Sequence, residues 1–88
     1  MIRRHIVVRG WVQGVGFRWR AQQAAHLYGC TGWVRNEWDG SVTLELQGEE
    51  KQINQVLLAV QQSRYVQVEE MEQQDVPVDP SEADFLTF

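Results

Sequence analysis

The segment from Gly10 to Arg18, GWVQGVGFR, constrains the fold more than any other part of this 88-residue chain. Apolar residues alternate before it, as in a β-strand, and recur at helical spacing after it. Gly14 and Gly16 lie at this change, where glycine permits a positive φ and leaves the backbone N–H groups open to a ligand. We therefore predict a strand, a tight glycine loop and a helix that begins at Phe17.

This loop is suited to binding an anion. The first N–H groups of a helix have no partner within the helix, and the positive end of the helix dipole lies beside them. Arg18 adds a planar, charged fork that can contact two phosphate oxygens. No Lys-Ser/Thr pair follows the glycines and the Gly-x-Gly-x-x-Gly spacing is absent, so a nucleoside triphosphate or a dinucleotide is not expected. The alternative is a plain tight turn beside a solvated arginine, and the local pattern alone does not separate the two.

Length and composition predict one small domain, residues 1–88. Apolar residues make up 43% of the chain and charged residues 23%, which is typical of a chain that folds around a single core. The single cysteine, Cys30, excludes an internal disulfide. No apolar run reaches the roughly 18 residues of a membrane helix, and the N-terminus lacks a signal-peptide pattern. We expect a cytoplasmic monomer with no membrane partner.

Charge is unevenly distributed along the sequence. Residues 1–40 carry six arginines and two acids, a balance of +4, whereas residues 41–88 carry two basic residues and ten acids, a balance of −8. A small anion would therefore meet a locally positive half. The acidic half argues against a continuous basic track, so no nucleic-acid partner is expected.

Hydrophobic periodicity predicts an α+β chain with the element order βαββαβ and a short final strand. The expected strands are residues 5–12, 31–35, 42–47, 65–71 and 85–88, and the expected helices are residues 17–28 and 49–62. The Asp39-Gly40 turn joins the second and third strands in a hairpin. This order is that of a ferredoxin-like sandwich, in which two helices lie on one face of an antiparallel sheet.

The first strand is apolar on both of its faces. Ile6 and Val8 lie on one side, and Val7 and Trp11 lie on the other. This pattern is typical of a central strand that is covered on both faces. We therefore expect cover on both sides of this strand.

Residues 10–18 and 32–48 carry two signatures of one family. The first has the form Gly-x-Val-Gln-Gly-Val-Gly/Ala-Phe/Tyr-Arg. The second is Gly-Trp-Val-Arg-Asn, three free positions, Gly, x, Val, five free positions and Gly. The chain thereby resembles the acylphosphatase family, small ferredoxin-like enzymes that hydrolyse the carboxyl–phosphate bond of acyl phosphates. The resemblance in element order covers nearly the whole chain.

The resemblance implies roles for individual residues, with a small-molecule acyl phosphate as substrate. The family's catalytic arginine, which holds the phosphate, falls on Arg18, and its catalytic asparagine, which orients the attacking water, falls on Asn36. The phosphate-binding backbone amides fall on Gln13, Gly14, Val15, Gly16 and Phe17. No metal and no cofactor is implied.

The chemistry of these residues fits the implied roles. Phosphoryl transfer mainly requires positioning and stabilisation of charge on the equatorial oxygens, which backbone amides and an arginine can provide. A carboxylate leaving group, with a conjugate-acid pKa of about 4, needs no protonating side chain. The Asn36 amide can accept a hydrogen bond from water and donate one to a phosphoryl oxygen. The alternative for Asn36 is a turn residue that bonds to its own backbone.

Other residues are weaker candidates. Trp19 in the predicted helix and Trp38 in the hairpin turn could each border the site and contact the acyl group. His5 and His26 have no second ligand at metal spacing, so a structural or solvated role is expected for both. Glu37 departs from the family pattern, and its charge is expected to weaken phosphate affinity slightly.

Two other functional classes remain open. The same fold occurs in RNA-binding modules, which need aromatic residues and basic charge on the exposed sheet face, but the matching aromatic motif is missing here. An acylphosphatase-like domain can also be part of a larger carbamoyl-transfer maturation protein. The chain's end at residue 88 and the lack of zinc-type cysteine clusters favour a stand-alone enzyme.

Overall fold

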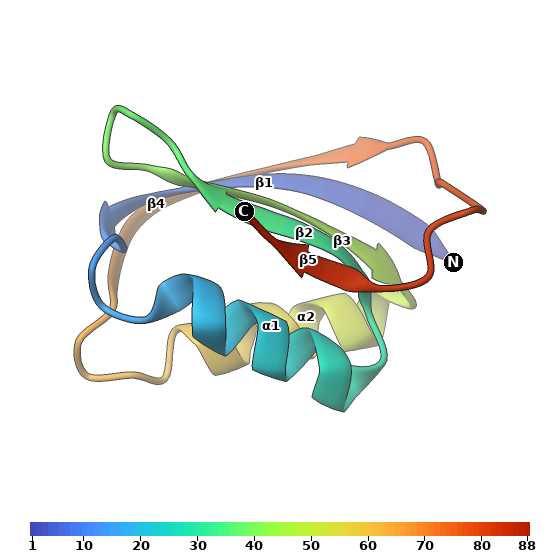
Figure 1. Ribbon diagram of the computed structural model, residues 1–88, viewed down its shortest axis with the longest axis horizontal. Coiled ribbons are helices and arrows are strands. Elements are labelled where there is room, and N and C mark those ends of the chain that lie inside the picture. Colours follow the sequence, from blue (N-terminus) through green and yellow to red (C-terminus); the bar gives the residue numbers. More distant parts are fainter.

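Two helices cover one face of a five-stranded sheet in the computed structural model, which describes residues 1–88 (Figure 1). The strands are β1 (Ile2–Trp11), β2 (Thr31–Asn36), β3 (Val42–Gly48), β4 (Gln67–Val76) and β5 (Phe85–Thr87), and the helices are α1 (Phe17–Tyr28) and α2 (Glu50–Val60). The spatial order of the strands is β4-β1-β3-β2-β5. The predicted ferredoxin-like architecture is confirmed. Neither helix is long and apolar enough to span a bilayer.

The sheet is mixed: its four longer strands pair antiparallel, as predicted, and the short additional strand β5 pairs in parallel. β5 pairs in parallel with β2, with Gly32 opposite Phe85 and Val34 opposite Thr87. The other pairs are antiparallel, so the last residues of β4 and the first residues of β2 lie at the same end of the sheet. The link of residues 77–84 crosses from β4 to β2 at that end of the sheet, so β5 starts beside the first residues of β2 and runs parallel to it.

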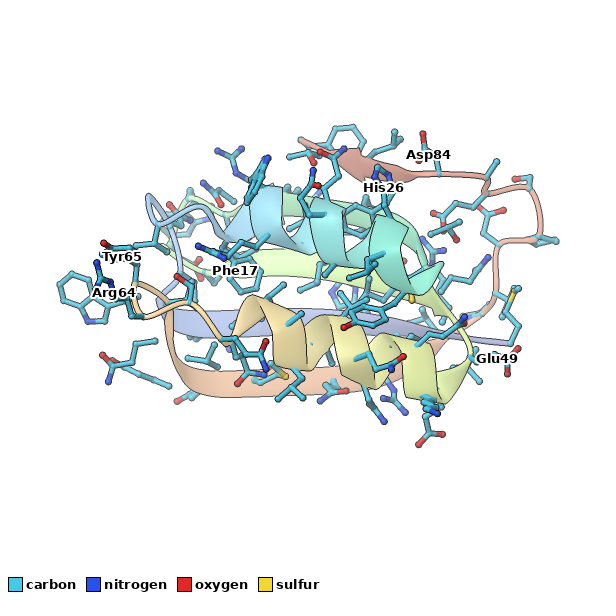
Figure 2. All side chains as sticks on the ribbon, turned by 90° about the horizontal axis from the view of Figure 1, so that it is seen from below. Phe17, His26, Glu49, Arg64, Tyr65 and Asp84 are labelled. Carbon is cyan, nitrogen blue, oxygen red and sulfur yellow. The ribbon has the colours of Figure 1, made fainter.

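The prediction that both faces of β1 are covered is wrong. Ile6 and Val8 are fully buried beneath the helices, whereas Trp11, on the opposite face, is 68% exposed. Figure 2 shows both helices side by side on the same face of the sheet. With no third layer, the apolar side chains on the far face of β1 are only partly covered by neighbouring strands.

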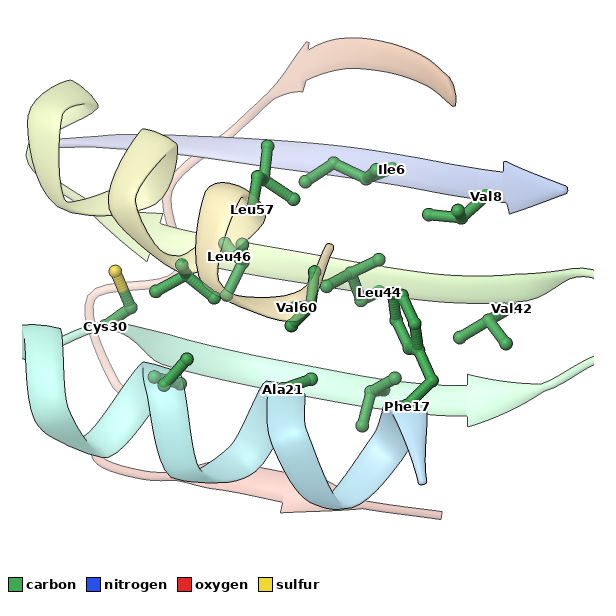
Figure 3. Close-up of a cluster of buried hydrophobic side chains, with 14 of the residues drawn as sticks. Ile6, Val8, Phe17, Ala21, Cys30, Val42, Leu44, Leu46, Leu57 and Val60 are labelled. Carbon is green, nitrogen blue, oxygen red and sulfur yellow. The ribbon is translucent and has the colours of Figure 1, made fainter. Parts of the chain in front are cut away.

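The core lies between the helices and the sheet. Figure 3 shows Leu44 and Leu46 of β3 facing Leu57 and Val60 of α2, with Phe17 at one end of the cluster. On α1 the buried positions are mostly alanines, which let this helix approach the sheet closely. The thiol of Cys30 lies at the other end of the cluster, and burial raises its pKa to about 11.

β1 begins earlier and β4 ends later than predicted because the two strands pair with each other. β1 begins at Ile2, and β4 runs to Val76 where the sequence predicted an end at Met71. β4 is polar and mostly exposed, so its side chains show little strand periodicity. Cross-strand ion pairs join it to β1, including Arg9 Nη1 to Glu72 Oε1 at 3.0 Å.

The far face of the sheet carries a buried polar network. Arg3 Nε lies 2.7 Å from Glu45 Oε1, and Arg3 Nη1 lies 2.8 Å from Glu82 Oε1. Burial alone would raise the pKa of the Glu45 carboxyl, but hydrogen bonds with His5 and Arg3 outweigh it and lower the pKa. This network fastens the link of residues 77–84, which leads into β5, to the sheet.

Candidate active site

A cavity of about 330 Å³ lies at the end of the sheet where the β1–α1 loop meets the C-terminal strand. We call it the loop cavity; its lining residues are Val12, Gly14, Gly16, Phe17, Arg18, Trp19, Gln22, Asn36 and Thr87. In Figure 1 the β1–α1 loop and the β2–β3 hairpin lie at the same end of the molecule. The fold therefore brings both predicted catalytic residues, Arg18 and Asn36, to one cavity.

Two glycines of the β1–α1 loop, Gly14 and Gly16, line this cavity. Gly14 and Gly16 adopt φ of 73° and 80°, in the left-handed region predicted for them. A side chain at either position would meet no atom within 4 Å, so the positive φ, not a lack of space, requires glycine. Gly16 is the N-cap of α1, without a side-chain cap and without an acid in the first turn. The first turn of α1 therefore carries N–H groups that suit an anion.

Gln13 joins this loop to the hairpin. Its Nε2 donates to the main-chain oxygens of Glu37 at 2.7 Å and Ser41 at 2.8 Å. Among the predicted phosphate-binding residues, Gln13 and Val15 do not line the cavity. The side chain of Gln13 instead holds the glycine loop at a set distance from the end of β2.

Replacing Gln13 by leucine is expected to lower the free energy of unfolding by about 1–3 kcal/mol, the sum for two lost hydrogen bonds. The Glu37 and Ser41 oxygens each keep a main-chain partner, so no acceptor is left without a bond. Urea denaturation measures this loss, with Gln74→Leu on exposed β4 as the control. An equal loss in both variants would show that Gln13 does not hold the two loops together.

Arg18 lies in the first turn of α1 and is oriented by the C-terminal end of the chain. Its Nη1 donates to the main-chain oxygen of Phe88 at 2.8 Å. Phe88 in turn donates its N–H to Val34 of β2, so the acceptor is fixed to the sheet. The Nε and Nη2 edge of the guanidinium can then form two parallel hydrogen bonds with an anion.

Ion pairs reduce the positive charge that the sequence predicted for residues 1–40. Four of the six arginines in residues 1–40 pair with carboxylates, namely Arg3, Arg4, Arg9 and Arg35. The first half of the sequence is therefore not a broadly positive surface. Arg18 pairs with no Asp or Glu side chain; its Nη1 bonds to the Phe88 oxygen, and its side chain lines the loop cavity.

Asn36 is the last residue of β2. Alternation along the strand places it on the same face as Val34, which is fully buried beneath the helices. Its side chain therefore projects toward the N-terminal end of α1 and lines the loop cavity. The next residue, Glu37, does not line it: the Glu37 carboxylate accepts a 2.6 Å hydrogen bond from Arg35 Nε, which is the main cause of its lowered pKa.

Sequence reasoning missed two cavity residues. Gln22 follows Arg18 by one helical turn, and that i, i+4 spacing was an available signal. Thr87 enters the cavity only because β5 pairs with β2, and no local pattern predicts that pairing. Of the two candidate tryptophans, Trp19 lines the cavity, whereas Trp38 is 98% exposed and does not line it.

The histidines lie away from the loop cavity. His5 Nδ1 bonds to Glu45 at 2.6 Å, and His26 Nε2 lies 3.3 Å from Asp84 Oδ1 (Figure 2). No group of three or more His, Cys, Asp or Glu side chains is arranged to hold a metal ion. The polar groups that line the cavity are the glycine backbone, the Arg18 guanidinium, and the side chains of Gln22, Asn36 and Thr87.

Comparison with known proteins gives consistent results. The sequence model of the family described as acylphosphatase matches residues 4–87. The chain is 46% identical to an acylphosphatase of Oceanobacillus iheyensis over 80 residues, which cover 86% of this chain and 88% of the relative. It is 41% identical to an acylphosphatase of Clostridium acetobutylicum over 87 residues, covering 97% of this chain and 96% of the relative.

Solved structures show the same relationship. The acylphosphatase of Bacillus subtilis superposes with a TM-score of 0.91 and 30% identity, covering 100% of this chain and 99% of the other. Full-length HypF, solved in its phosphate- and nucleotide-bound form, matches with a TM-score of 0.83 and 27% identity. That match covers 99% of this chain but 12% of HypF.

Proposed function

Because the chain belongs to the acylphosphatase family and hydrolyses acyl phosphates, we propose that the loop cavity is its active site. Arg18 and the glycine-loop amides hold the phosphate, and Asn36 orients the attacking water. The observation that carries this proposal is that Arg18, Asn36 and the glycine loop, which are distant in sequence, line one cavity.

The phosphate is held by donors that are in place before it binds. Gly14 and Gly16 expose backbone N–H groups, and α1 directs its positive end to the same space. Arg18, oriented by Phe88, offers its free edge to two phosphoryl oxygens. These groups stabilise charge on the equatorial oxygens without reorganising during the reaction.

Asn36 positions the nucleophile. Its side-chain oxygen accepts a hydrogen bond from water, and its NH₂ group donates to a phosphoryl oxygen, so the water lies in line with the leaving group. Water attacks phosphorus as the phosphorus–oxygen bond to the acyl group breaks. The carboxylate departs with the bonding electron pair, and a phosphate oxygen takes the proton from water. The products are a carboxylate and inorganic phosphate.

Hydrolysis of acetyl phosphate by the wild-type protein tests the proposed site. We expect turnover to be unchanged in excess chelator, because none of the proposed groups acts through a metal. We also expect inorganic phosphate to inhibit competitively, because it occupies the same glycine loop. Loss of activity in chelator that is restored by a divalent metal would contradict the metal-free site, and non-competitive inhibition would place phosphate elsewhere.

The proposal keeps the remaining expectations from the sequence. We infer that the enzyme acts as a cytoplasmic monomer on a small-molecule acyl phosphate, without a nucleic-acid or membrane partner. The ion pairs that occupy Arg3, Arg4, Arg9 and Arg35 support the absence of a nucleic-acid track. Gel filtration at several protein concentrations tests the monomeric state.

A further inference from the structure

Trp19 lies between two hollows of the surface. It lines the loop cavity and also a second hollow of about 340 Å³ between the two helices. We call the second hollow the interhelical groove; its lining residues are Trp19, Arg20, Gln23, Ala24, Leu27 and Ala59. Figure 2 shows α1 and α2 running side by side along this face. The indole is 62% exposed, so it forms a wall shared by the two hollows.

Trp19 is the main apolar surface that a substrate meets in the loop cavity. The other apolar side chains in its lining, Val12 and Phe17, are buried in the core. The rest of the lining is glycine backbone and polar side chains. Because Arg18 and Trp19 both line the loop cavity, the acyl group of a phosphate held by Arg18 can reach the indole.

Along α1 the groove is apolar at Trp19, Ala24 and Leu27 and polar at Arg20 and Gln23. Residues 19, 23 and 27 follow one another at single-turn spacing, so they form a stripe on the helix surface. Leu27 is the last residue of this stripe and is 74% exposed. Ala24 and Ala59 also line the groove, and their small side chains leave space between the two helices. From Trp19 to Leu27 the groove runs for eight residues of helix, or about 12 Å.

We propose that the acyl group of the substrate packs on Trp19 and that a longer apolar acyl chain continues along the interhelical groove to Leu27. This inference rests on the proposed function, because it takes the phosphate position from the loop cavity. It identifies apolar acyl phosphates, aromatic or medium-chain, as the preferred substrate class.

Arg20 does not prevent an apolar chain from binding. The carbon stem of an arginine side chain can line a groove as apolar surface. Its Nε is already buried without a hydrogen-bond partner in the free protein. An apolar chain over the groove therefore removes no hydrogen bond from this nitrogen.

The first test compares benzoyl phosphate with acetyl phosphate in wild type and Trp19→Ala. The measured quantity is the ratio of kcat/KM for benzoyl phosphate to that for acetyl phosphate. The two substrates differ in intrinsic reactivity, but this difference is the same in both variants, so it does not affect the change in the ratio. We expect Trp19→Ala to lower this ratio by about 10-fold, mainly through a higher KM for benzoyl phosphate. Trp38→Ala is the matched control and should leave the ratio unchanged, because Trp38 lines neither hollow.

The second test addresses the groove with octanoyl phosphate. Leu27→Asn is expected to lower the octanoyl-to-acetyl ratio by about 3- to 10-fold, since part of the chain loses apolar contact. Leu58→Asn, an exposed leucine on α2 outside the groove, is the control. An unchanged benzoyl ratio in Trp19→Ala, or an octanoyl ratio indifferent to Leu27, would overturn the inference. Absence of acetyl phosphate turnover in wild type would instead contradict the proposed function.

Discussion

Replacing Arg18 by lysine is expected to lower kcat/KM for acetyl phosphate by about 10³- to 10⁵-fold, the usual cost of losing an arginine that stabilises phosphoryl charge. This corresponds to roughly 4–7 kcal/mol of transition-state stabilisation. Lysine keeps the positive charge but presents a point charge instead of a planar fork. It cannot bond to the Phe88 oxygen and also place two parallel donors against the phosphate, as the guanidinium can.

The kinetic pattern of the Arg18 variant identifies its role. In the proposed site Arg18 contacts the phosphate before and during the reaction, so we expect KM and the inhibition constant of inorganic phosphate to rise as kcat falls. Arg64→Lys is the matched control, because Arg64 is exposed and bonds to Tyr65 away from the loop cavity. Turnover close to that of wild type in Arg18→Lys would remove Arg18 from the site.

Asn36→Ala is expected to lower kcat by about 10²- to 10³-fold, similar to the loss of one preorganised donor at a site of developing charge. Without the carboxamide, the water loses its acceptor and one phosphoryl oxygen loses a donor. In the proposed site the glycine loop and Arg18 would still bind the phosphate, so the inhibition constant of inorganic phosphate should change by no more than about twofold.

Asn54→Ala on α2 provides the control for Asn36→Ala. Asn54 is exposed and bonds to Arg4 on the α2 side of the sheet, outside the loop cavity. We expect this variant to keep the turnover of wild type. If Asn36→Ala also kept it, or lost phosphate affinity as strongly as Arg18→Lys, the separate roles assigned to Asn36 and Arg18 would be wrong.

Local patterns predicted the parts of the fold that depend on neighbours in sequence. Glycine at positions 14 and 16 permits a positive φ, and the structure has it at both. Gly29 ends α1, and Asp39-Gly40 turns the hairpin, as expected from the same conformational preferences. Each of these features is decided by the backbone freedom of one or two residues.

Patterns failed where pairing between distant segments decides the outcome. β4 is polar and exposed, so only its hydrogen bonds and ion pairs with β1 reveal its length. The direction of β5 depends on where the 77–84 link crosses the sheet, which no turn signal records. The side-chain role of Gln13 depends on carbonyl groups more than 20 residues away.

The sequence by itself determined the element order, the glycine loop and the two residues proposed for catalysis, because these follow from local conformational preference and from two signatures of fixed spacing. The tertiary structure alone decided which donors are free to meet a substrate. In the folded protein four arginines pair with acidic side chains, and a hydrogen bond to the Phe88 oxygen orients Arg18. Folding also places Thr87 and the exposed indole of Trp19 in the lining of the cavity. Availability for binding depends on contacts between segments far apart in the chain, and such contacts exist only after folding.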